Sequence, residues 1–243
     1  MKNIKYLLII LLFISCNKKV ELQDVFTSSE VINAMLPADG SSTTEVKVEL
    51  PVDSDPSKRG VVFSASNGSI VGAQQGKLVV KANFENGKLI AKATFKSSLK
   101  PGDASVTIIP EQQSAYKDFN ITKKITLQPS LPHTVKLEYS TPAIRNNYQS
   151  EIFLRAMVYN DMGKGVSEGV EVKFDEYTEP LTPFSGRYRY SNKGTTSGDS
   201  SSVSTFFSVG NIPANINFFV KAEVFENGNP TGKSDVIQLT VIN

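Results

Sequence analysis

Short runs of alternating apolar and polar residues recur along most of the chain, and helical spacing is hard to find after residue 15. Residues 45–52, for example, read Glu-Val-Lys-Val-Glu-Leu-Pro-Val. Glycine, asparagine, aspartate and proline separate these runs, as expected of turns between strands. Because a strand alternates its side chains between two faces, the pattern predicts an all-β protein with many short strands, either a sandwich or a barrel.

The expected strands fall into two halves of about 100 residues, which is the size of one immunoglobulin-like (Ig-like) sandwich. In the first half we expect strands at residues 45–52, 61–65, 77–84, 88–95, 104–109 and 120–127. In the second half we expect them at 134–139, 152–159, 170–174, 202–209, 216–225 and 235–242. The chain is therefore predicted to contain two tandem Ig-like β-sandwiches, at residues 30–128 and 134–243, joined by a proline-containing linker at 129–133.

Two stretches have the chemistry of hairpin turns. Glu85-Asn86-Gly87 separates the apolar runs 77–84 and 88–95, and Asn-Gly readily adopts the positive φ angles of a two-residue turn. Asn227-Gly228 and Thr231-Gly232 stand between the last two expected strands. We predict that each stretch joins two neighbouring antiparallel strands.

Particular segments resemble a known family. Residues 38–42 read Ala-Asp-Gly-Ser-Ser, and a strand pattern and the run 60–70 follow them. Residues 158–166 and 169–174 carry a similar pattern in the second half. These segments resemble the bacterial Ig-like domains of the invasin and intimin type, which implies their sandwich fold. The second half departs from the family in lacking the Ala-Asp-Gly start and in having Gly165 where proline is usual.

The first residues have the organisation of a secretion signal. Lys2 and Lys5 precede nine apolar residues, and Ser15 and Cys16 follow. The sole cysteine of the chain at this place resembles the lipobox of bacterial lipoproteins, although Phe13 stands where the family usually has leucine. The resemblance implies removal of residues 1–15, acylation of Cys16 by palmitate-like chains, and a polar tether at 16–29. A cleaved signal without acylation and an uncleaved anchor are the alternatives.

The length and charge of these segments indicate where in the cell the protein is located. Nine residues span about 14 Å as a helix, which is half the hydrocarbon core of a bilayer, so the acyl chains would form the membrane anchor. Asn17 is not the aspartate that resembles an inner-membrane retention signal, which favours the outer membrane. The chain without residues 1–15 carries 24 basic and 24 acidic residues, so no basic excess favours nucleic acid.

The chain has few of the histidine and cysteine residues that often serve in catalysis or metal binding. His133 is the only histidine and falls in the expected linker, so we expect it to be exposed rather than catalytic. One cysteine and one histidine do not form a zinc or copper site. Asp53-Ser54-Asp55 is the nearest approach to a calcium loop but lacks further ligands. Residues 228–234 resemble a phosphate-binding loop but are expected to form a turn. We predict no cofactor, no metal and no enzymatic activity.

One aromatic and basic segment is the candidate binding site. Arg187, Tyr188, Arg189 and Tyr190 lie in the irregular stretch 177–202, and arginine and tyrosine are enriched at contact hot spots. The same alternation also fits a plain strand with both tyrosines inside and both arginines in water, which is the interpretation we favour. Loops gather at the ends of such sandwiches, so 177–202 and the turns 160–165 and 227–232 are the expected contact regions.

These observations predict a lipid-anchored, non-enzymatic envelope protein that acts as a structural, adhesive or interaction module. The main alternative is a glycan- or nutrient-binding accessory lipoprotein of an outer-membrane uptake system. A hydrolase with carboxylates from distant strands and a subunit of an envelope machine are further alternatives. The sequence does not name the protein or glycan partner.

Overall fold

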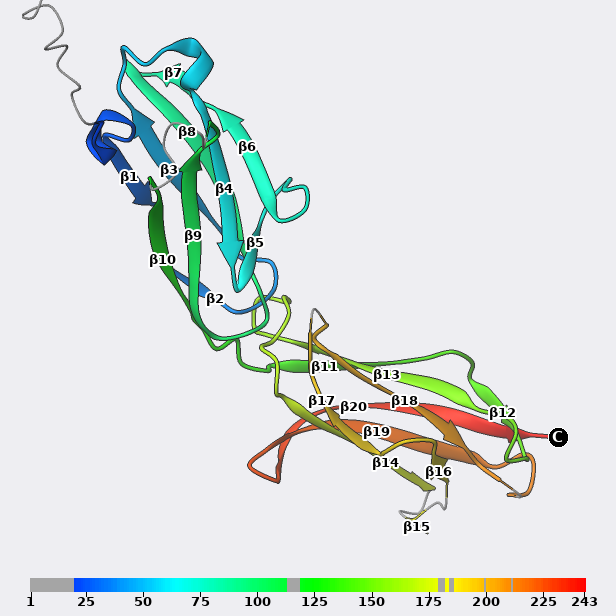
Figure 1. Ribbon diagram of the computed structural model, residues 1–243. Coiled ribbons are helices and arrows are strands. Elements are labelled where there is room, and N and C mark those ends of the chain that lie inside the picture. Colours follow the sequence, from blue (N-terminus) through cyan, green and yellow to red (C-terminus); the bar gives the residue numbers. More distant parts are fainter. Residues whose placement is uncertain (1–19, 113–118, 179–181, 184–185, 199, 211) are drawn as a thin grey trace, which may run out of the picture.

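The computed structural model describes residues 20–112, 119–178, 182–183, 186–198, 200–210 and 212–243. These residues form two pairs of β-sheets with only short 3₁₀ turns beside them (Figure 1). The prediction of an all-β fold with Ig-like sandwiches is confirmed. Cys16 and the predicted signal segment lie outside the described residues.

The first pair of sheets uses residues up to 128. One sheet has the order β1-β3-β8-β5, with β7 also paired to β8, and the other has the order β2-β10-β9-β4-β6. The bounds are η1 (Leu22–Asp24), β1 (Ser28–Val31), β2 (Met35–Pro37), β3 (Thr43–Leu50), η2 (Pro56–Lys58), β4 (Gly60–Ser66), β5 (Gly68–Ile70), β6 (Lys77–Lys81), β7 (Asn83–Glu85), β8 (Lys88–Ser97), β9 (Gly102–Pro110) and β10 (Ile121–Gln128).

The second pair of sheets uses residues from 134 onward. Its sheets have the orders β11-β13-β18-β16 and β12-β20-β19-β14-β15, with β17 also paired to β14. The bounds are β11 (Thr134–Tyr139), β12 (Ala143–Arg145), β13 (Ile152–Tyr159), β14 (Glu171–Thr178), β15 (Thr182–Pro183), β16 (Arg187–Tyr188), β17 (Lys193–Thr195), β18 (Ser202–Ser208), β19 (Asn217–Glu226) and β20 (Asn229–Ile242).

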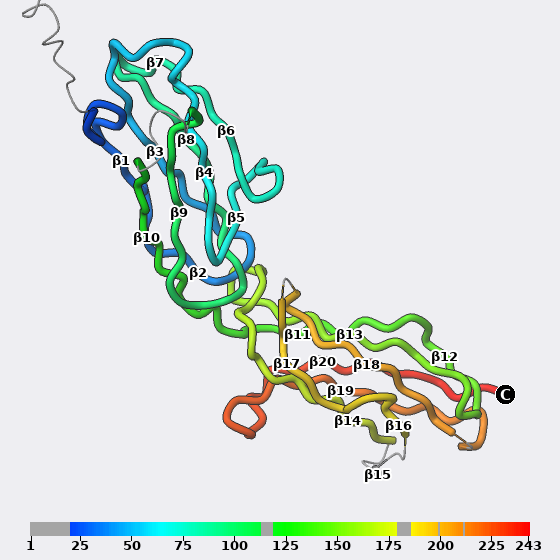
Figure 2. Tube along the Cα trace, in the orientation of Figure 1, coloured from blue at the N-terminus to red at the C-terminus, as the bar shows by residue number. Residues whose placement is uncertain are grey.

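Both sandwiches begin in the same way. In each, the first strand pairs with one sheet and the next short strand crosses to the other, where it runs parallel to the last strand: β2 with β10, and β12 with β20. Figure 2 shows the chain path of the two sandwiches and the short connection between them. The short strands β1, β2, β5, β12, β15 and β17 have too few residues for an alternating pattern and were not expected from the sequence.

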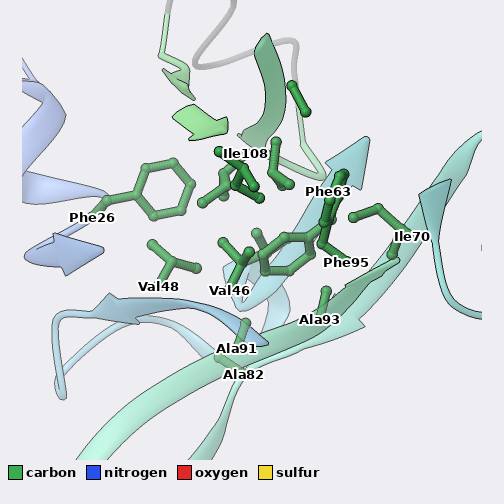
Figure 3. Packing of buried hydrophobic residues seen from close by; sticks show 14 of the residues in the cluster. Phe26, Val46, Val48, Phe63, Ile70, Ala82, Ala91, Ala93, Phe95 and Ile108 are labelled. Atoms are coloured by element: carbon green, nitrogen blue, oxygen red, sulfur yellow. The ribbon is translucent and has the colours of Figure 1, made fainter. Parts of the chain in front are cut away.

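The alternating runs supply the cores. In β3 the side chains of Val46, Val48 and Leu50 point inward and are buried, as the sequence pattern predicts. They meet Phe63 and other apolar residues from the facing sheet (Figure 3). The second core is likewise built from aliphatic and aromatic residues, so burial of apolar side chains stabilises both sandwiches.

Three expectations about the first sandwich are wrong. The run 77–84 is not one strand, because it changes sheets at the buried Ala82: β6 pairs with β4, whereas β7 pairs with β8. Val52 is exposed, because β3 ends before it at Leu50. Phe26 lies in the stretch expected to be a tether, yet only 4% of it is exposed because it packs into the first core.

Both Asn-Gly turns are confirmed, and the position expected of Gly232 is wrong. Asn86 and Gly87 have φ angles of 50° and 80° and join β7 to β8 as predicted. Asn227 and Gly228, with φ angles of 52° and 78°, likewise join β19 to β20. Gly232 is not in this turn; it lies inside β20 opposite a β-bulge between Glu223 and Phe225.

Candidate functional site

The four residues of the candidate binding segment are described and occupy different environments. β16 pairs with β18 through Arg187 and Ser208 and through Tyr188 and Phe207. Tyr188 points inward, as the strand interpretation predicts. Tyr190 does not: it follows the strand and is 78% exposed, because β16 ends at Tyr188.

Tyr188 is held by a partly buried hydrogen bond. Its hydroxyl donates to Glu176 Oε2 at 2.7 Å, and its ring packs against Phe207 with centroids 5.0 Å apart. Burial, together with the negative charge of Glu176, raises the pKa of Tyr188 well above its ordinary value. Tyr188 therefore anchors this segment to the second core and presents no polar group to a ligand.

Arg189 is also engaged within the protein. Its guanidinium forms a two-pronged ion pair with Glu151, one prong of which joins Nε to Oε1 at 2.9 Å. The same guanidinium lies 4.6 Å from the centre of the Phe206 ring. Arg187, in contrast, is exposed, and its side chain has no hydrogen bond or ion pair with the described part of the chain.

These residues line a small surface cavity that the sequence alone did not predict. Its volume is about 210 Å³, and its lining residues, which we call the distal cluster, are Tyr148, Glu151, Arg187, Arg189 and Ser208. Tyr148 comes from the loop between β12 and β13, so three separate segments build the cluster. In Figure 1, β12 and β16 lie at the end of the second sandwich that points away from the first.

Sequence reasoning missed Tyr148, Glu151 and Ser208. One signal was available: Asn146-Asn147-Tyr148 is turn-forming sequence followed by an aromatic residue. In the structure Asn147 Oδ1 accepts hydrogen bonds from the backbone N–H of Gln149 and Ser150, which fixes the turn.

The two other expected contact regions lie elsewhere. The turn 160–165 packs against the first sandwich, where Lys164 Nζ lies 3.6 Å from Asp39 Oδ2. The turn at Asn227 lies beside Leu131 and Pro132, near the connection between the two sandwiches. Neither turn adjoins the distal cluster, so the three regions do not form one binding surface.

Two of the segments that resemble the invasin type, residues 38–42 and 158–166, meet at the junction between the two sandwiches. Asp39 accepts hydrogen bonds from the backbone N–H of Ser41 and Ser42 at 2.8 and 2.6 Å. Ser167 of the second sandwich donates a hydrogen bond to the Ala38 carbonyl at 3.1 Å. These contacts give the Ala-Asp-Gly segment a structural role.

Among the described residues, the remaining candidates do not come together in a catalytic or metal-binding arrangement. His133 is exposed. Asp53 and Asp55 line a hollow of about 250 Å³ with Asp24 and Lys58. Asp55 accepts a hydrogen bond from the Ser57 backbone N–H, which lowers its pKa, whereas a catalytic acid needs a raised one. Among the described residues, no three His, Cys, Asp or Glu side chains lie close enough to hold a metal, and no helix has the length and apolarity to cross a membrane.

Comparison with known proteins identifies the fold. No protein-family model matches the sequence, and no curated protein matches it. Among solved structures, invasin, described as a bacterial integrin-binding protein, matches 88% of this chain and 38% of its own chain with a TM-score of 0.52 and 14% identity. The chain has the invasin-type Ig-like fold. The resemblance seen in the sequence is thereby confirmed at the level of fold.

Two further structures match with lower TM-scores. The adhesin InvE of Yersinia pseudotuberculosis has a TM-score of 0.42 and 16% identity, with coverage of 90% of this chain and 60% of that one. The D0-D1 domain of intimin has a TM-score of 0.32 and 15% identity, with coverage of 88% and 98%. This chain therefore spans less than two thirds of both InvE and invasin.

Proposed function

We propose that this protein is a non-enzymatic adhesion or interaction module of the bacterial cell envelope, anchored by lipid at Cys16. In this proposal the acyl chains hold residue 16 at the membrane, most simply the outer membrane. The first sandwich then serves as a spacer, and the second presents the distal cluster to a partner.

One observation carries the proposal: the first described residues and the distal cluster lie at opposite ends of the two-sandwich chain. In Figure 1 the segment that leads into β1 is at the far end of the first sandwich, and β12 and β16 are at the far end of the second. An anchor at the first end places the distal cluster as far from the membrane as the structure allows. The invasin-type fold supports a spacer role but does not fix the function.

Contacts across the junction between the two sandwiches support the same proposal. Three types of contact cross it: the ion pair of Lys164 with Asp39, the Ser167 hydrogen bond to Ala38, and a 2.9 Å hydrogen bond from the Glu168 N–H to the Leu99 carbonyl. Leu99 is buried there. We expect these contacts to limit bending between the sandwiches, which suits a spacer.

The test uses cells that produce the full-length protein. We expect the wild-type protein to be acylated and membrane-bound, and Cys16→Ser to be released, as measured by intact mass and membrane fractionation. Surface proteolysis should reach the second sandwich before the first. Cells with Arg187→Glu should attach more weakly to surfaces to which wild-type cells attach. A protein that is unacylated and fully soluble in wild-type cells contradicts the proposal.

The alternative role in an outer-membrane uptake system is favoured by the aromatic and basic character of the distal cluster. It predicts co-purification of the lipidated protein with a transporter and impaired growth of a deletion strain on a particular glycan. The adhesion module predicts impaired attachment instead, so the two measurements separate the roles.

A further inference from the structure

The distal cluster has one positive charge with no partner among the described residues, and it lies beside a polar cavity. Arg189 is neutralised by Glu151, whereas the Arg187 guanidinium has no side-chain partner among the described residues. The backbone of Arg187 is nevertheless fixed, because β16 pairs with β18 and the Arg189 N–H donates to the Phe206 carbonyl at 2.9 Å. The cavity therefore offers one available guanidinium on a fixed strand.

An aromatic ring stands on the other side of the same cavity. Tyr148 is 61% exposed. Gly210 lies under it: a Cβ at this position would be 2.6 Å from ring atoms Cε1 and Cζ of Tyr148. Gly210 also has a φ angle of 63°, so both the backbone and the ring contact favour glycine there. Part of the ring therefore packs against Gly210, while most of Tyr148 is exposed.

Ser208 completes the lining. Ser208 is only 4% exposed, and its hydroxyl makes a long contact of 3.5 Å with the Arg187 carbonyl at the edge of the cavity. A cavity of about 210 Å³ is smaller than the roughly 300–1,000 Å³ of pockets for drug-sized ligands, so it suits one ring or one small group. An aromatic face, a guanidinium and a hydroxyl are thereby placed around a space of that size.

These three groups match the chemistry of an acidic sugar. The electron-rich face of a tyrosine ring attracts the C–H groups on the flat face of a pyranose. A guanidinium binds a carboxylate through two parallel hydrogen bonds. A single available arginine is too little for nucleic acid or an anionic bilayer, both of which need several basic groups together. An acidic peptide makes no comparable use of the exposed ring.

We propose that the distal cluster binds a carboxylate-bearing sugar residue of a glycan, with the carboxylate on Arg187 and the sugar ring on Tyr148. The proposal rests on the proposed function, since it names the ligand of the same distal surface. With one ring bound in an open cavity, we expect weak binding, with a Kd on the order of 1 mM for a monosaccharide. Tighter attachment then requires many copies of the protein on one surface.

The test is saturation-transfer NMR with the full-length protein in detergent, using glucuronic acid and N-acetylneuraminic acid as acidic probes and glucose as the neutral probe. We expect transfer to both or either acidic sugar, strongest at the ring protons, and at least a tenfold weaker Kd for Arg187→Gln. Tyr148→Ala and Gly210→Ala should weaken binding similarly. The matched control is Arg145→Gln, an exposed arginine of β12 that does not line the cavity and should leave the Kd unchanged.

Four results would overturn the inference: no transfer to either acidic sugar, equal transfer to glucose, undiminished binding by Arg187→Gln, or full competition by acetate. The last result would mean that a carboxylate alone is recognised. Thermal unfolding of each variant excludes misfolding as the cause of lost binding. If neither acidic sugar binds while attachment of cells still depends on Arg187, the proposed ligand class is wrong and the proposed function stands. If attachment is also independent of Arg187 and Cys16, the ligand proposal and the proposed function are both wrong.

Discussion

Lys164 of the second sandwich reaches across the junction to Asp39 of the first, with 3.6 Å between Nζ and Oδ2. The same ammonium donates a hydrogen bond to Ser42 Oγ at 3.2 Å. Lys164 leaves a turn that Asn160 shapes, since Asn160 Oδ1 accepts from the Lys164 backbone N–H. One flexible side chain thus joins the two turns that face each other at the junction.

Replacing Lys164 tests whether this contact restrains the two sandwiches. We expect Lys164→Met to lower the free energy of unfolding by only about 0.2–1 kcal/mol, because the lysine is 40% exposed. The same change should broaden the distribution of distances between spin labels placed on the two sandwiches. Lys136→Met is the control, because Lys136 pairs with Glu138 inside one sandwich. Equal distance distributions for wild type and Lys164→Met would contradict a restraining role.

Asp39 should contribute more to stability than any exposed carboxylate. Its side chain is fully buried and accepts hydrogen bonds from Ser41, Ser42 and Ser97. Asp39→Ala leaves these donors without a partner, so we expect the first sandwich to lose about 3–5 kcal/mol. Asp55→Ala is the matched control: Asp55 also accepts from a nearby N–H but is exposed, so its loss should destabilise the first sandwich far less than Asp39→Ala does. Chemical denaturation of both variants measures the difference.

The same carboxylate predicts a pH dependence. Burial alone would raise the pKa of Asp39, but hydrogen bonds from Ser42 and Ser41 and the charge of Lys164 hold it below the ordinary 3.8. A carboxyl whose pKa is lowered by folding stabilises the fold above its ordinary pKa, and this contribution is lost as the pH falls through the folded value. Unfolding measured from neutral pH down to about pH 2 should therefore show a steeper acid loss for wild type than for Asp39→Asn. Parallel curves would contradict the assignment.

Long alternating strands were predictable, whereas the joins between sheets were not. β11 and β13 have the bounds expected from the sequence; in β13 every second residue is buried, whereas in β11 only Leu137 is. Ala82 gave no such signal, since its burial depends on β6 and β7 belonging to different sheets. The distal cluster was partly predicted: Arg187 and Arg189 stood out by residue type, but Tyr148 comes from a loop about 40 residues earlier that only the tertiary fold brings near.

Gly165 stands where the family usually has proline, and the structure gives a reason for glycine at this position. A Cβ at this position would lie 2.8 Å from the Asp39 carbonyl oxygen across the junction and would also collide with Ser201 Oγ. Gly165→Ala should therefore destabilise the protein by about 1–3 kcal/mol and shift the relative position of the sandwiches. Gly194→Ala is the control, because its Cβ would meet only the Val203 side chain inside the second sandwich. X-ray scattering of both variants distinguishes a changed junction from a changed core.

Phe26 tests whether the residues before β1 belong to the first sandwich. Only 4% of Phe26 is exposed, and its N–H donates to the Leu22 carbonyl at 2.8 Å. We expect Phe26→Ala to cost about 3–5 kcal/mol of unfolding free energy, as truncation of a buried phenylalanine does. Leu22→Ala, in the same segment but 37% exposed, should change it by less than about 0.5 kcal/mol. If both variants unfold like wild type, this segment is only a tether.

Tyr188 and Tyr190 stand two residues apart and should respond differently to loss of the hydroxyl. Tyr188→Phe keeps the ring contact with Phe207 but removes the hydrogen bond to Glu176, so we expect a loss of about 1.5–3 kcal/mol. Tyr190→Phe, at an exposed position, should leave the free energy of unfolding unchanged within about 0.5 kcal/mol. Glu176→Gln should recover part of the loss in the Tyr188→Phe background, because the amide is less costly to leave unpaired than a carboxylate. Additive effects of the two substitutions would show that the hydroxyl and Glu176 are not coupled.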